Sequence, residues 1–189
     1  MLMHESGTYE PSLLSADWPR YSHQPFPCYR FVPGSTPHPR RDPRGHSYGS
    51  AEATPPAFSP DAWPDSEAYR YGIDLYNFAY WWECHDTFES LWHMAGTKTQ
   101  QGNFFQALIQ IAAANFKRAL GASASAEKLA RYGLTRFSHV PPHYMGVDVE
   151  ALTQDVRDYF VGSRQQPAQI QLALPADPVR EMPPSQPRQ

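Results

Sequence analysis

The stretch at residues 80–92, YWWECHDTFESLW, combines ionisable and aromatic side chains at spacings that could do chemistry. His85 and Glu89 lie four positions apart, so on a helix one side chain stacks a turn above the other. An imidazole titrates near neutrality and a carboxylate in apolar surroundings holds its proton more tightly, so this pair could exchange protons or bind a metal ion. Glu83 and Asp86 fall toward the other side of the helix, where solvent or a further element could meet them.

A second polar pair, Gln106 and Gln110, is also four apart and lies within the apolar run at residues 100–120. Two helices that each carry such a pair on an apolar face should pack along those faces. We therefore expect one buried cluster, with Asn77 near its end, made of His85, Glu89, Gln106 and Gln110. Burying such groups unpaired costs on the order of 1–3 kcal/mol each, so they must bond to one another, to water or to a ligand.

Three interpretations of the cluster stay open. In the first it is structural, and Glu89 accepts a hydrogen bond from His85. In the second it is a divalent metal site, of the kind that helical bundles build from inward Glu and His residues three and four positions apart. Either His85 with Glu89 or Glu83 with Asp86 would then give two ligands, fewer than the zincin helix supplies. In the third, the pair acts as a metal-free acid and base.

The distribution of proline predicts the layout of the chain. Of 20 prolines, none falls between Pro64 and Pro141. Proline inside a helix costs about 3 kcal/mol or more, so this window predicts a helical core between two non-helical ends. We expect an all-α protein, a compact bundle of four to five helices at residues 65–161.

Apolar periodicity and capping residues place the helices within that bundle. The first begins near Asp65 or Ser66, and the third should be the most buried because it is apolar over most of its circumference. The expected helices lie at about residues 66–77, 80–94, 100–120, 124–138 and 149–161, the last capped by Asp148.

The flanking segments have distinct compositions. Residues 1–17 show no periodicity and are expected to be flexible. Residues 18–64 form an extended arm and spacer rich in proline, aromatic and basic residues, and we expect the arm to lay its rings on its own core or on a partner. Residues 162–189 are rich in Pro and Gln and predict a disordered tail with little to pack.

Charge and motifs exclude several functions. A formal net charge of −3 argues against general nucleic-acid binding. No phosphate-binding glycine loop and no serine-hydrolase elbow occurs, and no apolar run is long enough to span a membrane. We expect a cytoplasmic protein with Cys28 and Cys84 as free thiols, and the small core makes a homo-oligomer plausible.

Three blocks in order resemble the domain-of-unknown-function family numbered 309, which comprises small all-helical proteins catalogued as predicted metal-dependent hydrolases. The resemblance covers about residues 66–138. Its blocks are Asp74-Leu75-Tyr76-Asn77, then Glu83-x-His85-Asp86-x-x-Glu89-x-x-Trp92, then Gln106-Ala107-Leu108-Ile109-Gln110. Asp86 replaces the usual glutamate, and Ala79 stands where a glycine commonly separates the first two helices.

The preferred hypothesis is a metal-dependent hydrolase acting on an unknown small molecule. His85 and Glu89 would be metal ligands, and Glu83 or Asp86 a further ligand or general base. Asn77, Gln106 and Gln110 would orient these groups. The alternative is a non-catalytic protein-interaction module, in which the polar cluster is structural and the arm binds a protein partner.

Overall fold

The computed structural model describes residues 18–51 and 54–174 and is mostly helical. A 3-10 helix, η1 (Pro60–Asp65), precedes α1 (Glu67–Asn77), α2 (Trp81–Ala95), α3 (Gln100–Ala119) and α4 (Ser123–Phe137). A two-stranded hairpin, β1 (His143–Tyr144) and β2 (Val147–Asp148), leads into α5 (Val149–Val161). The predicted all-α bundle is confirmed.

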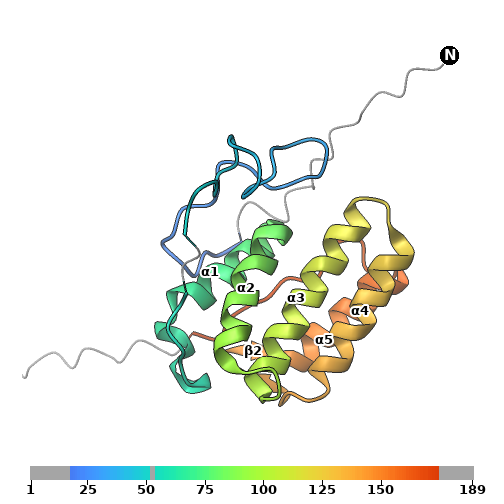
Figure 1. Cartoon of the computed structure of the whole chain (residues 1–189). Coiled ribbons are helices and arrows are strands. Elements are labelled where there is room, and N and C mark those ends of the chain that lie inside the picture. Colours follow the sequence, from blue (N-terminus) through green and yellow to red (C-terminus); the bar gives the residue numbers. More distant parts are fainter. Residues whose placement is uncertain (1–17, 52–53, 175–189) are drawn as a thin grey trace, which may run out of the picture.

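Helix α3 lies at the centre, packed between α2 and α4 (Figure 1). Its Phe104, Phe105 and Leu108 are fully buried, as the apolar circumference predicted. Close approach of α4 depends on Gly133, where an added Cβ would lie 2.7 Å from the Ile111 side chain.

Capping residues begin three of the helices where the sequence indicates. The side chains of Ser66, Thr99 and Asp148 accept hydrogen bonds from the backbone of the first turns of α1, α3 and α5. The turn from α1 to α2 depends on Ala79, whose φ is 62°. A left-handed conformation costs a non-glycine residue roughly 1–2 kcal/mol. The turn therefore keeps the glycine-type geometry although an alanine occupies it.

The segment after α5 corrects the prediction of a disordered tail. Residues 163–174 turn back along the bundle, and Ala168, Ile170 and Leu172 are buried. The Leu172 position pairs with Val147 of β2, and the Ala173 N–H donates to Gly146. Alternating apolar residues in QIQLAL make this segment a strand-like strap, a pattern that its Gln and Pro content obscured. The rest of the predicted tail, residues 175–189, and the predicted flexible leader, residues 1–17, lie outside the described residues.

The N-terminal arm, here residues 18–50, lies on its own core, which settles the alternative left open by the sequence. It is the blue and cyan segment over one end of α1 and α2 in Figure 1. Phe26 stacks on Tyr80 with ring centroids 4.9 Å apart, and Phe31 packs edge-on against Trp82. Within the described part of the chain, no helix is long and apolar enough to cross a membrane.

Candidate functional site

His85 and Glu89, the predicted metal ligands, lie together on α2 but not in a sealed interior. The distance from His85 Nδ1 to Glu89 Oε2 is 3.9 Å, and the two side chains are 40% and 48% exposed. The expectation of a buried cluster is therefore wrong for this pair. The core-facing stripe of α2 consists instead of Trp81, Cys84, Phe88 and Leu91.

The three amide side chains expected around that pair separate into different environments. Gln106 and Gln110 are half-buried on α3, and no described residue bonds to the buried Oε1 of Gln110. Asn77 is fully buried and points elsewhere: its Nδ2 donates to the Ile170 carbonyl, and its Oδ1 accepts from the Ile170 N–H, both at 2.7 Å. Asn77 thus holds the C-terminal strap rather than a ligand-binding pair.

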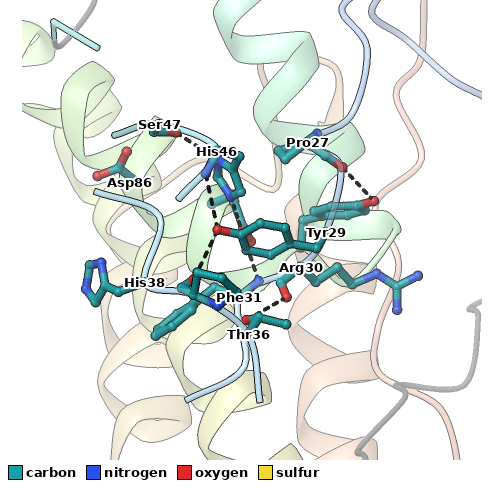
Figure 2. A network of polar contacts seen from close by, with 12 residues as sticks. Pro27, Tyr29, Arg30, Phe31, Thr36, His38, His46, Ser47 and Asp86 are labelled. Carbon is teal, nitrogen blue, oxygen red and sulfur yellow. Dashed lines mark hydrogen bonds and ion pairs between the residues drawn. The ribbon is translucent and has the colours of Figure 1, made fainter. Parts of the chain in front are cut away.

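Glu83, a predicted general base, is buried against the arm. Its Oε1 accepts a hydrogen bond from the Phe31 N–H at 2.8 Å and lies 3.2 Å from His46 Nε2. The other ring nitrogen, His46 Nδ1, is 2.8 Å from Ser47 Oγ, and the Tyr29 hydroxyl accepts from the His46 N–H (Figure 2). Of the two possibilities left open for Glu83, solvent or a further element, the structure shows a further element, the arm.

Burial also shifts the pKa of this carboxyl. Desolvation raises the pKa of Glu83 above its usual value, and the hydrogen bonds from Phe31 and His46 offset only part of that rise. The second oxygen, Oε2, is buried and has no hydrogen-bond partner among the described residues. Such a group is suited to holding the arm, and substrate could reach it only if the arm moved.

Asp86, the other predicted base or ligand, also bonds to the arm. Arg40 Nη2 donates to Asp86 Oδ2 at 2.6 Å, and both side chains are about one-third exposed. On the same turn, Ser90 Oγ donates to the Asp86 backbone carbonyl. Both motif carboxylates on this side of α2 thus accept hydrogen bonds from residues more than 35 positions earlier in the chain.

Two carboxylates of α1 complete the attachment of the arm, and sequence reasoning missed both. Asp74 is fully buried and accepts from Arg20 Nε, the Tyr21 N–H and the Ser22 N–H at 2.8–2.9 Å. Glu67 accepts from Ser22 Oγ, and this bond is the largest cause that lowers the pKa of Glu67. One signal was present: Asp74 stands directly between the apolar Ile73 and Leu75 in the predicted helix.

A cavity of about 670 Å³ lies beside these contacts, between the arm, the residues before η1, and one side of α1 and α2. Its walls are largely apolar, and its charged residues are Arg40, Asp65, Glu67 and Asp86. Tyr71 also lines it, and burial raises the pKa of this phenol to about 12, so the hydroxyl is neutral at physiological pH. Its O–H donates to the Pro25 carbonyl of the arm.

The structure places the predicted metal ligands in two environments. Across residues 18–51 and 54–174, no three His, Cys, Asp or Glu side chains are grouped so that they could hold one metal ion. His85 and Glu89 supply two ligands, while Glu83 and Asp86 are engaged by the arm. Zinc sites use at least three protein ligands, so an ion at His85 and Glu89 would need a further ligand, and metal binding stays a prediction.

Comparison with known proteins relates part of the helical bundle, from α1 to α4, to a protein family. No curated protein matches the chain. A family model described as Domain of unknown function (DUF309) matches residues 69–129, from the first turn of α1 to the middle of α4. The match includes Asp74, Glu83, Asp86 and the His85–Glu89 pair and leaves the arm outside. From the first turn of α1 to the middle of α4, the chain is therefore similar to the DUF309 family.

Proposed function

We propose that this chain is a non-catalytic interaction module in which the carboxylates of α1 and α2 hold the N-terminal arm in a fixed shape. One observation carries the proposal. Glu83 and Asp86, the residues best placed by type for catalysis, both accept hydrogen bonds from the arm. A general base must reach a substrate proton within hydrogen-bond distance. The Glu83 side chain is 6% exposed, which favours a structural role.

The fixed arm offers a protein partner an exposed loop that carries the basic and aromatic residues Arg41, Arg44 and Tyr48. Arg44 is held by its own neighbour Asp42, through bonds from its backbone and guanidinium, and its side chain remains 79% exposed. Arg41 and Tyr48 of the same loop are also exposed. Arginine and tyrosine are enriched at protein interfaces, and a preformed loop loses little conformational entropy on binding. A partner with an acidic surface fits this loop.

The test measures how strongly the arm is protected from hydrogen exchange when the buried acceptor, Glu83, is substituted. Hydrogen exchange of the Phe31 amide should accelerate strongly in Glu83→Ala, because the amide loses its acceptor, and less in Glu83→Gln, which retains an oxygen at that site. Glu89→Ala is the matched control on the same helix, because its side chain contacts no arm residue among those described. Equal protection of the arm in wild type and in Glu83→Ala would overturn the proposal.

A metal-dependent hydrolase is the competing proposal, supported by the joint exposure of His85 and Glu89. An ion arriving from solvent could contact both side chains, and a substrate or water would have to complete its coordination. Metal analysis of the purified protein separates the two proposals. Stoichiometric metal that is lost in His85→Ala and retained in His93→Ala, an exposed histidine on the same helix, would support the hydrolase. No retained metal in the wild type would support the interaction module.

The compartment and the oligomeric state belong to the same proposal. Cys28 is exposed and Cys84 is buried, and both are free thiols, which fits the reducing cytoplasm. Association of two copies through the exposed loop would appear as a concentration-dependent mass in sedimentation.

A further inference from the structure

We propose that the cavity between the arm, η1, α1 and α2 binds a small organic cation, an amine or guanidine attached to an apolar body. This inference goes beyond the interaction module, because it assigns a small-molecule ligand to the cavity rather than a protein partner to the exposed loop. The volume, the walls and the charge of the cavity each support it.

The volume and walls suit a small molecule with an apolar body. The cavity of about 670 Å³ lies within the roughly 300–1,000 Å³ typical of small-ligand pockets. Pro55, Pro56 and Phe58 form one wall, and Ala62 and Ala68 form another. Small side chains on the second wall leave room for a ring beside Phe58. Burial of that ring would supply most of the affinity.

The charges favour a cation over an anion. Among the described residues, three carboxylates line the cavity against one guanidinium. Arg40 is bonded to Asp86 at 2.6 Å, and Arg70, just outside, is bonded to Glu67 at 2.6 Å. Asp65 has no hydrogen bond or ion pair with any described residue, and it is exposed at the end of η1. The negative charge that remains is therefore on Asp65, where a ligand ammonium could pair with it.

Polar groups along the same wall can orient the ligand. Thr87 of α2 lines the cavity and forms no side-chain hydrogen bond with the described residues, so its hydroxyl is free to accept from an ammonium group. The Tyr71 hydroxyl donates to the Pro25 carbonyl, and its oxygen can still accept a hydrogen bond. Asp65, Thr87 and Tyr71 thus supply polar groups among the largely apolar residues that line the cavity.

The arm is part of the cavity, which links ligand binding to the arm's position. Gln24 and Arg40 of the arm line the opening, and both segments are held by the carboxylates described above. Loss of the arm would open the cavity to solvent on that side. Ligand and arm should therefore stabilise each other, since binding to the folded form alone raises its stability.

Calorimetric titration of the full-length chain with phenethylamine tests the proposal, and hydrocinnamate serves as the matched anion with the same phenyl and two-carbon frame. Phenethylamine should bind and hydrocinnamate should not. Asp65→Asn should weaken amine binding by about fivefold or more, as expected for one exposed charge pair. Ala68→Phe should abolish binding by filling the cavity. Glu150→Gln, an exposed acid on α5, should bind like wild type.

Each alternative result overturns the inference. Equal binding of the amine and the anion would remove the charge argument, and unchanged affinity in Asp65→Asn would place the ligand elsewhere. No binding of phenethylamine by the folded wild type, at concentrations up to the millimolar range typical of fragment-sized ligands, would exclude the site. Circular dichroism on each variant separates loss of binding from loss of fold. Because arm protection is measured without ligand, failure here leaves the interaction module standing.

Discussion

His46 of the arm and Glu83 of α2 meet at 3.2 Å in a contact where the two side chains are 9% and 6% exposed. The residues are 37 positions apart in the chain, and the contact places an imidazole against a carboxyl whose pKa is raised chiefly by burial. The polar side of α2 is thereby closed by a segment from outside the family domain.

Glu83 should make stability depend on pH. Because its pKa is raised in the folded protein, the carboxyl contributes stability that is fully present below the unfolded value of 4.5 and is lost as pH rises through the folded value. In urea unfolding between about pH 4 and pH 8, wild type should lose more stability than Glu83→Gln. A difference between the two proteins that is the same at every pH would contradict this assignment.

Asp74 should be the most sensitive position in the attachment of the arm. Asp74→Ala would leave two backbone N–H groups and the Nε of Arg20 without their acceptor, at about 1–3 kcal/mol for each buried group. We expect a large loss in the free energy of unfolding and rapid tryptic cleavage within residues 20–44. Asp42→Ala, which removes an exposed partner of Arg44, is the control and should cleave at the wild-type rate in the rest of the arm.

His85 and Glu89 should matter little for stability. The pair is partly exposed, and its atoms are 3.9 Å apart, so His85→Ala and Glu89→Ala should each change the free energy of unfolding by about 0.5 kcal/mol or less. Losses above about 2 kcal/mol in urea unfolding would indicate the sealed polar cluster that the sequence suggested.

Ala79→Gly should be tolerated, unlike other buried alanine-to-glycine changes. Glycine adopts the φ of 62° without strain, which offsets the loss of one buried methyl group. Ala112→Gly, in the buried middle of α3, is the matched control and should cost about 1 kcal/mol or more in thermal unfolding. An equal cost at both positions would show that the left-handed turn stores no strain.

Asn77 should fasten the C-terminal strap. Asn77→Leu would leave the Ile170 N–H and carbonyl unpaired in the interior, at about 1–3 kcal/mol each. A chain ending at residue 165 should lose similar stability relative to one ending at residue 174, because only the shorter chain lacks buried Ala168, Ile170 and Leu172. Equal unfolding midpoints of the two truncated chains would contradict the role of the strap.

Helices were predictable because their signals are local. The bounds of α3 and α5 and the caps Ser66 and Asp148 follow from periodicity and capping chemistry within a few residues. The free state of both cysteines is confirmed as well. The hydrolase and interaction hypotheses remain predictions, because nothing in the fold measures an activity.

The orientation of α2 was harder to predict, because two neighbouring stripes compete for the interior. Trp82, His85, Glu89 and Trp92 share one helical spacing, and Trp81, Cys84, Phe88 and Leu91 share another. Periodicity identifies a stripe but does not decide which of two adjacent aromatic stripes faces the core. Partners of Glu83 and Asp74 come from a proline-rich arm, where no periodic signal exists.

A hydrogen bond between Tyr21 and Leu172 joins the two ends of the described chain. The Leu172 N–H donates to the Tyr21 hydroxyl, so residues 151 positions apart meet on α1. During synthesis on the ribosome, α1 emerges long before the strap that covers it. The nascent chain must therefore carry an incompletely covered α1 until residue 172 has left the ribosome, because the Tyr21–Leu172 contact can form only then.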